Sequence, residues 1–233
     1  MIRAVFFDLD DTLYPEIEFY RQGFAAVAEE LAGRGIGAAE FVRATLERLH
    51  FADREAVLDR ASAVLGFPRD WVPDLLHRFR GCEIRLRLPA ETDAILHRLC
   101  PFYRLAIITD GHAQVQERKL AALGLIGRVD TVVICDHLGR RHWKPDSLPF
   151  QTACRNLKVR PQEAIFVGDH PQRDILGALR AGLGAVRIRT ALGWFRDRPN
   201  LPEAQPWAEI ERLDQLPGVL RSEITPKSLE AVR

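Results

Sequence analysis

An apolar segment near the N-terminus ends in two aspartates. Residues 3–7 (Arg-Ala-Val-Phe-Phe) are rich in β-branched and aromatic side chains and are predicted to form a buried strand. Asp8 and Asp10 follow and, because side chains alternate along an extended backbone, point the same way. Two adjacent carboxylates are costly unless a cation binds them or they differ in protonation state. The pair therefore indicates a phosphoryl-transfer site with a nucleophile, an acid/base and a magnesium ion. The alternative is a strand followed by an Asp-rich turn.

A second predicted strand, residues 104–109, ends in groups that suit phosphate binding. The hydroxyl of Thr109 can donate to a phosphoryl oxygen. The backbone N–H groups of Asp110 and Gly111 provide two more donors where the next helix is expected to begin. The alternative for Thr109 is an ordinary β-branched strand residue.

Two later segments carry one cation and two more carboxylates. Lys144 precedes Pro145 and supplies a compact positive charge, although a solvated loop lysine is the alternative. The predicted strand 164–168 runs into Asp169, a hard oxygen ligand for magnesium, and Asp174 follows five residues later. The ordered set of four segments, more than any one of them, indicates a phosphoryl-transfer enzyme.

Taken in order, the four segments resemble the motifs of the haloacid dehalogenase superfamily of aspartate-nucleophile hydrolases, and the resemblance covers the chain apart from its tail. It implies that Asp8 is the nucleophile and that Asp10 is the general acid/base. It also implies that Thr109 and Lys144 hold the phosphoryl oxygens. With the backbone N–H groups of Asp110 and Gly111 described above, they make up the expected substrate-binding set.

The same resemblance implies Mg²⁺ as the cofactor. By this resemblance Asp8, the backbone carbonyl of Asp10 and Asp169 hold the ion. By the same resemblance Asp174 supports the metal site without binding the ion directly.

Residues after the second motif are similar to those of one branch of the superfamily. The spacing of Gln116 and Lys119 looks closest to the branch that contains pyrimidine-nucleotide and acylneuraminate phosphatases. Asp110 departs from close relatives, which usually carry Asn there, and is expected to cap the helix that starts near Gly111.

Trp143 and His112 each allow two interpretations. Trp143 ends the basic loop 140–143, which is longer than in relatives, and either stacks on a substrate base or sugar or packs the loop. His112 either borders the site or is an ordinary residue of a first helical turn.

Alternating strands and helices predict the fold class, an α/β Rossmann-like parallel sheet with helices on both faces and an inserted helical cap. The predicted strands are residues 3–7, 104–109, 130–134, 164–168 and 184–189. The predicted helices of the sheet domain lie near 112–122, 148–157 and 173–181. Consecutive amphipathic helices without a strand are predicted at 16–32, 39–49, 53–65 and 70–80.

The expected organisation is a catalytic core of residues 1–13 and 87–222, a cap of residues 14–86 and a tail of residues 223–233 that includes frayed residues. An irregular loop at 190–206 and a short helix around 207–214 complete the prediction.

Composition agrees with an intracellular enzyme. The 233 residues carry a net charge of +1, which argues against a nucleic-acid partner bound through phosphate neutralisation. The four cysteines show no paired spacing and are expected to be buried free thiols. A strand at the very N-terminus predicts no signal peptide, and no apolar stretch is long enough to cross a bilayer, so the expected location is the cytoplasm, without a membrane partner.

The predicted function is a magnesium-dependent phosphatase that acts on a small phosphorylated metabolite through a phospho-aspartyl intermediate. Asp10 argues against a dehalogenase, which needs no second carboxylate there. A phosphomutase keeps the same residues, but its usual Gly after the second aspartate is Asp11 here. A non-catalytic binding protein on this fold is a third alternative. The physiological substrate and the oligomeric state do not follow from the sequence.

Overall fold

The chain divides into two compact units. A computed structural model describes residues 1–49 and 56–224. The first unit contains Met1–Pro15 and the chain from Arg87 onward, and the second contains Glu16–Leu86. The predicted cap, residues 14–86, coincides with the second unit apart from Tyr14 and Pro15. The function of this unit as a cap stays a prediction.

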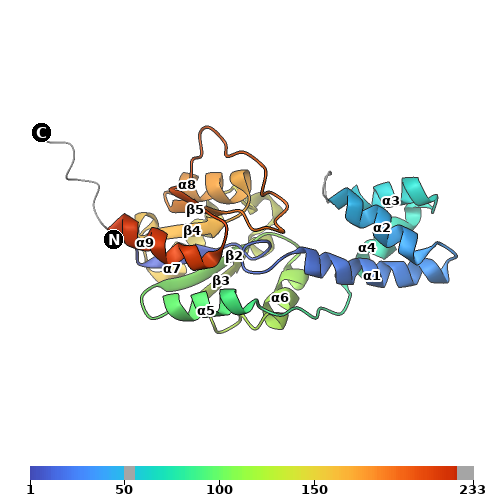
Figure 1. The fold of residues 1–233 in the computed structure, drawn as a ribbon, viewed down its shortest axis with the longest axis horizontal. Coiled ribbons are helices and arrows are strands. Elements are labelled where there is room, and N and C mark those ends of the chain that lie inside the picture. The colour runs from blue at the N-terminus through green and yellow to red at the C-terminus, as the bar shows by residue number, and fades with distance from the viewer. Residues whose placement is uncertain (50–55, 225–233) are drawn as a thin grey trace, which may run out of the picture. The chain divides into compact units, whose positions relative to one another are not determined.

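The first unit is built on a six-stranded parallel sheet with the order β3-β2-β1-β4-β5-β6 (Figure 1). The strands are β1 (Ala4–Phe7), β2 (Arg104–Thr109), β3 (Thr131–Ile134), β4 (Ala164–Gly168), β5 (Gly184–Ile188) and β6 (Ala208–Ile210). Strand β1 lies between β2 and β4, and its four residues are completely buried. The α/β fold class predicted from the sequence is confirmed.

Register places the carboxyl ends of the central strands at one level. Phe7 at the end of β1 lies opposite Ile107 of β2 and Val167 of β4. Residues that follow these positions therefore emerge at the same edge of the sheet. In open parallel sheets this edge is where ligands bind.

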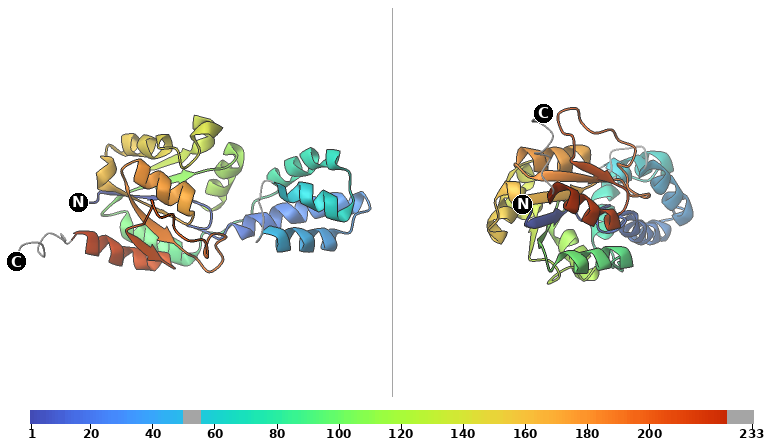
Figure 2. Two further views of the ribbon diagram at one scale, coloured as in Figure 1. Left: turned by 90° about the horizontal axis from the view of Figure 1, so that it is seen from above. Right: turned by 60° about the vertical axis from the view of Figure 1, so that its left-hand side comes forward.

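Helices cover both faces of the sheet. They are α5 (Ala90–Leu99), α6 (Ala113–Ala122), α7 (Leu148–Leu157), α8 (Gly177–Arg180) and α9 (Leu216–Ile224), with a π-helical turn (Pro171–Leu176) before α8. In Figure 2, left, α7 and α8 lie on one side of the sheet and α5 and α9 on the other. Alternate side chains of each strand face the two sides, and Phe6, Ile108 and Phe166 belong to the hydrophobic cluster that includes residues of α7 and α8.

In the described residues the second unit contains only helices. These are α1 (Ile17–Gly33), α2 (Ala38–Leu49), α3 (Val57–Leu65) and α4 (Val72–Arg80), with a 3₁₀ turn (Arg69–Trp71) before α4. Aromatic side chains form its core: the Phe79 ring centroid of α4 lies 5.1 Å from that of Phe24 and 5.3 Å from that of Phe19. Gln22 of α1 bonds the backbone N–H and carbonyl of Arg85, which ties the return segment to this helix.

The structure differs from the sequence prediction in the C-terminal part of the chain and at one helix. The helix expected around 207–214 is wrong, because this region forms β6 and then a 3₁₀ turn (Leu213–Gln215). Trp207 donates its N–H to the Ala185 carbonyl and packs against Gly184, so tertiary contacts with β5 draw this short segment into the sheet. Helix α5 was not predicted. Of the predicted tail, residues 225–233 lie outside the described residues, whereas α9 continues to Ile224.

Cysteine burial also differs from expectation at one position. Cys82, Cys135 and Cys154 are buried, but Cys100 is exposed. Across the part of the chain that the structure describes, no helix has both the length and the apolar character required to cross a bilayer.

Candidate active site

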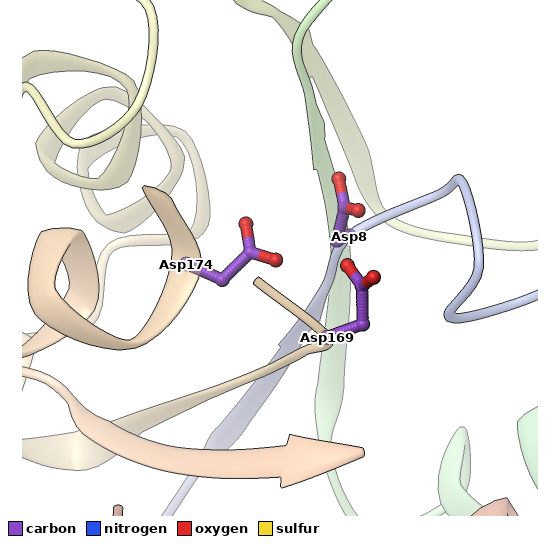
Figure 3. A group of neighbouring side chains, drawn as sticks. All are labelled: Asp8, Asp169 and Asp174. Atoms are coloured by element: carbon purple, nitrogen blue, oxygen red, sulfur yellow. The ribbon is translucent and has the colours of Figure 1, made fainter. Parts of the chain in front are cut away.

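Three carboxylates meet at the carboxyl edge of the sheet (Figure 3). Asp8 follows β1, Asp169 follows β4, and Asp174 lies in the π-helical turn after it. Ligand atoms of the three lie within 4.8 Å of one another, and all three residues are buried. Gly168 permits this arrangement, because a Cβ there would lie 2.6 Å from Cγ of Asp174. The structure therefore brings Asp8 together with Asp169 and Asp174, which lie far from it in the sequence.

Lys144 is the cation of this cluster. Its Nζ donates to Oδ1 of Asp8 at 2.6 Å and to Oδ1 of Asp174 at 2.7 Å, and its side chain is only 3% exposed. Burial alone lowers the pKa of Lys144, but the charges of Asp174 and Asp8 outweigh it and raise that pKa well above its usual range. Lys144 is thus a fixed positive charge held between two carboxylates.

The three aspartates differ in their protonation behaviour. Burial raises the pKa of Asp8 to about 8, helped by Asp174 and Asp10 and opposed by Lys144. Burial and the charges of Asp174, Asp11 and Asp8 raise the pKa of Asp169 well above its usual value. Burial also raises the pKa of Asp174, but the Lys144 charge and the hydrogen bonds that Asp174 accepts outweigh it and lower that pKa. Asp8 and Asp169 are therefore the two carboxylates of the cluster whose ionised forms are disfavoured.

The donor set fits a divalent cation. Among the described residues, Oδ2 of Asp169 is buried without a hydrogen-bond partner. Asp174 is already satisfied, since Oδ1 accepts from Lys144 and Oδ2 accepts from the N–H of His170 at 2.9 Å. Hard carboxylate oxygens with a surplus of negative charge suit Mg²⁺. Asp8 and Asp169 are therefore the candidate side-chain ligands, with Asp174 anchoring Lys144 and the turn.

Asp10 makes its own group of hydrogen bonds, separate from those of the Asp8, Asp169 and Asp174 cluster. Its Oδ1 accepts from Lys119 Nζ at 2.7 Å and from the Tyr14 hydroxyl at 2.5 Å, while Oδ2 accepts from Nε2 of Gln116 at 2.8 Å. Burial raises the pKa of Asp10, but the Lys119 charge and these three donors outweigh it and lower the pKa. The structure thus holds Asp10 as a carboxylate.

Thr109, Asp110 and Gly111, at the end of β2, lie next to the hydrogen-bond partners of Asp10. Thr109 is completely buried, and its Oγ1 accepts a hydrogen bond from Nε2 of Gln116 at 2.6 Å. Gly111 has φ of +122°, a conformation that side chains rarely adopt. Asp110 accepts from the backbone N–H of Lys144 at 3.1 Å, which joins the second motif to the third.

The expected capping role of Asp110 is wrong. Asp136, after β3, accepts the N–H of Ala113 at 3.0 Å and so satisfies the start of α6. His112 is the N-cap residue by position but makes no side-chain capping bond. Asp110 instead accepts the backbone N–H of Lys144. The capping oxygen of α6 comes from Asp136, a residue that spacing in the sequence does not connect to this helix.

The loop before Lys144 packs onto the sheet domain. Trp143 is partly buried against the hydrophobic cluster, and the guanidinium of Arg140 lies 5.4 Å from its ring centroid. Of the two interpretations of Trp143, the structure favours packing.

Arg187 of β5 is a buried residue that the sequence reasoning missed. It is completely buried, and its Nε donates to the backbone carbonyl of Asp169 at 3.2 Å. Its other nitrogens donate to Oδ1 of Asn200 and to the carbonyl of Phe195. The signal available in the sequence was a lone arginine inside an apolar strand, a position at which a buried charge requires a specific reason.

His170, which follows Asp169, caps the π-helical turn. Its Nδ1 accepts the N–H groups of Gln172 and Arg173. Burial and the charge of Arg173 lower the pKa of His170 to about 3, so its ring is neutral. This neutral ring allows Nδ1 to act as an acceptor.

Comparison with known proteins agrees with this geometry. The family model of haloacid dehalogenase-like hydrolases matches residues 2–182. The chain is 34% identical to a glyceraldehyde 3-phosphate phosphatase of Methanopyrus kandleri, over 95% of this chain and 98% of that protein. It is 28% identical to the human N-acylneuraminate-9-phosphatase, over 95% and 94% of the two chains. The magnesium-bound crystal structure of the hydrolase YfnB from Bacillus subtilis has a TM-score of 0.73 at 20% identity, covering 94% of this chain and 98% of that one.

The class that the fold and site define is a hydrolase with an aspartate cluster at the carboxyl edge of a parallel sheet. The chain belongs to the haloacid dehalogenase-like hydrolase family.

Proposed function

We propose that this hydrolase is a magnesium-dependent phosphatase that cleaves small phosphomonoesters through a phospho-aspartyl intermediate on Asp8. The observation that carries the proposal is the cluster of Asp8, Asp169 and Asp174 at the sheet edge, in which Asp8 and Asp174 share the buried Lys144. The curated relatives that the chain resembles over nearly its whole length are named as phosphatases.

In the first half-reaction a carboxylate oxygen of Asp8 attacks phosphorus in line. The Asp8–phosphorus bond forms as the bond to the ester oxygen breaks. Asp10 enters this step protonated, with the proton that it takes from water in the preceding turnover, and gives that proton to the leaving oxygen. Lys144 and the backbone N–H groups of Asp110 and Gly111 offset the charge on the phosphoryl oxygens.

In the second half-reaction water attacks phosphorus, and Asp10 accepts its proton. The lowered pKa of Asp10 favours its carboxylate form, which supports this role as a base. Phosphate leaves, and the free Asp8 carboxylate is restored.

The cofactor is needed for a physical reason. Without a cation, burial gives Asp8 a pKa of about 8, and much of the nucleophile is protonated at neutral pH. Mg²⁺ held by Asp8, Asp169 and the carbonyl of Asp10 would favour the ionised nucleophile and offset phosphoryl charge.

The second unit, Glu16–Leu86, is proposed to be the cap that sets substrate selectivity. Its arginines, among them Arg78 and Arg80, offer positive charge for an anionic substrate. Under this proposal Arg78→Ala and Arg80→Ala change the ranking of physiological esters more than the hydrolysis of a small aryl phosphate.

The experiment is a phosphate-release screen over nucleotides, sugar phosphates, phosphoserine and triose phosphates, with and without Mg²⁺. We expect turnover with Mg²⁺ and none for Asp8→Asn, whose thermal unfolding should match that of the wild type. Borohydride reduction after acid quench should convert phosphorylated Asp8 to homoserine, visible by peptide mass. Full activity of Asp8→Asn would refute the mechanism, and isomerised ester without released phosphate would identify a mutase.

A further inference from the structure

Gln116 links two parts of the candidate site that come from different motifs. One side-chain amide nitrogen, Nε2, lies 2.8 Å from Oδ2 of Asp10 and 2.6 Å from Oγ1 of Thr109. The side chain is 98% buried, and it projects from the same face of α6 as Lys119, which binds the other oxygen of Asp10. A single residue therefore contacts both the proposed acid/base and a proposed phosphate ligand.

The orientation of the Gln116 amide follows from its partners. Oδ1 of Asp10 already accepts from Lys119 Nζ and the Tyr14 hydroxyl, and Oδ2 is the acceptor that faces Gln116, so the Gln116 atom opposite it must be the NH₂ group. The two N–H bonds of this group then serve one partner each, Asp10 and Thr109.

The bond from Gln116 also constrains the Thr109 hydroxyl. Since Oγ1 accepts from Nε2, its own hydrogen must point elsewhere. Among the described residues, the acceptor for this hydrogen is the Asp110 carbonyl at 3.3 Å, a long contact. A phosphoryl oxygen is a stronger acceptor, and the hydroxyl is left oriented to donate to it.

Gly111 allows this packing. A Cβ at Gly111 would lie 3.1 Å from Cδ of Gln116, tighter than ordinary van der Waals contact. The turn after β2 therefore closes directly over the Gln116 side chain, which limits the rotamers open to it.

We propose that Gln116 is a positioning residue that holds the Asp10 carboxylate in place and makes the Thr109 hydroxyl a donor to the substrate phosphate. The inference rests on the proposed function. It assigns two separable effects to one amide: one on proton transfer to the leaving group, through Asp10, and one on phosphate binding, through Thr109.

The test compares Gln116→Met, which keeps the shape and removes both donors, with Gln116→Glu, which replaces the donors by acceptors. The matched control is Gln114→Met, an exposed position on the same helix. Substrates are p-nitrophenyl phosphate and phenyl phosphate, which have good and poor leaving groups, and inorganic phosphate serves as a competitive inhibitor.

We expect Gln116→Met to lower kcat for phenyl phosphate about 10- to 100-fold, with a smaller loss for p-nitrophenyl phosphate, because a good leaving group needs less help from Asp10. Inhibition by phosphate should weaken about 10-fold. Gln116→Glu should lose more on both measures, and Gln114→Met should match the wild type.

A double-mutant cycle separates the Thr109 effect. If Gln116 acts on phosphate binding through Thr109, adding Gln116→Met to Thr109→Val should not weaken phosphate inhibition further. Additive losses would overturn this half of the proposal.

Two other results would overturn the whole proposal. One is wild-type behaviour of both Gln116 variants, and the other is an equal loss on the two esters with unchanged phosphate inhibition, which indicates general damage to the fold. Both presuppose an active wild type. A wild type that hydrolyses no phosphomonoester in the screen instead refutes the proposed function itself.

Discussion

Arg187 donates from Nε to the backbone carbonyl of Asp169, 3.2 Å away, and is completely buried. The guanidinium donates three hydrogen bonds to neutral oxygens, on Asp169, Phe195 and Asn200. Burial lowers the pKa of Arg187, while the charges of Glu209, Asp169 and Asp174 favour its charged form. The guanidinium therefore fixes the strand end that carries a candidate metal ligand.

Replacing Arg187 by Met should weaken both folding and metal binding. The variant leaves the buried Asp169 carbonyl and two part-buried acceptors without their donor, and we expect a loss of about 2–4 kcal/mol in the free energy of unfolding. Urea unfolding and calorimetric titration with Mg²⁺ measure the two effects. Arg189→Met is the control, since Arg189 bonds the carbonyls of Arg196 and Arg198 but not that of Asp169. Equal Mg²⁺ affinity in Arg187→Met and the wild type would contradict the positioning of Asp169.

Replacing Lys144 should abolish activity and destabilise the fold, because the Lys144 ammonium group lies between two buried carboxylates. Lys144→Met leaves Asp8 and Asp174 without their shared cation, so we expect no turnover and a loss of about 3–5 kcal/mol in stability without metal. Adding Asp174→Asn removes one of the stranded charges and should recover part of that stability without recovering activity. Denaturant unfolding of the single and double variants tests this coupling. A double variant less stable than Lys144→Met would show that repulsion is not the cause.

The fold and the main site residues could be predicted because they depend on local patterns. Apolar runs that stop at Asp8, Thr109 and Asp169 identify strands and the polar groups at their ends. Parallel pairing in register then places those ends at one edge, which the pairing of Phe7 with Ile107 and Val167 shows.

Contacts between distant segments could not be predicted in the same way. The cap of α6 comes from Asp136, across the β3 loop, rather than from nearby Asp110. Strand β6 has three residues, too few for periodicity to distinguish from a helical turn, and is decided by pairing with β5. The partners of Arg187 are a backbone carbonyl, an asparagine and a loop carbonyl, none of which has a sequence signature.

Metal removal should abolish activity and lower thermal stability. Burial and neighbouring carboxylates raise the pKa values of Asp8 and Asp169 and so disfavour their ionised forms, and a cation that binds these forms in the folded state stabilises that state. We expect no turnover in chelator, recovery with Mg²⁺, and a rise in the unfolding temperature as Mg²⁺ is added. Ca²⁺ should inhibit, because its larger and looser coordination does not keep the octahedral geometry of Mg²⁺.

Two variants test this metal response. Asp169→Asn should need more Mg²⁺ for half-maximal activity. Asp136→Asn, which keeps a capping oxygen outside the cluster, should respond to Mg²⁺ like the wild type. Strong turnover in excess chelator would exclude a metal requirement.

The thiol of Cys154 should make folding stability fall at alkaline pH. Cys154 lies in the hydrophobic cluster on α7, and burial raises its pKa from its ordinary value of 9.0 to about 11. Between these two values the unfolded chain releases a proton that the folded chain keeps. Unfolding therefore becomes easier as the pH rises from 9 to 11, by up to about 1.4 kcal/mol per pH unit. Below pH 9 both states hold the proton, and the contribution is constant.

Cys154→Ala removes this titration and should flatten the decline in stability between pH 9 and 11, even if the lost packing lowers stability by a constant amount at every pH. The matched control is Cys100→Ala, at an exposed cysteine that should leave the slope of the wild type unchanged. Urea unfolding of the three proteins under reducing conditions, at half-unit steps from pH 8 to 10.5, gives the slopes directly. Cys135 stays in all three proteins, so its buried thiol contributes equally and cancels in the comparison. Parallel curves for Cys154→Ala and the wild type would mean that the Cys154 thiol ionises in the folded protein as readily as in the unfolded chain.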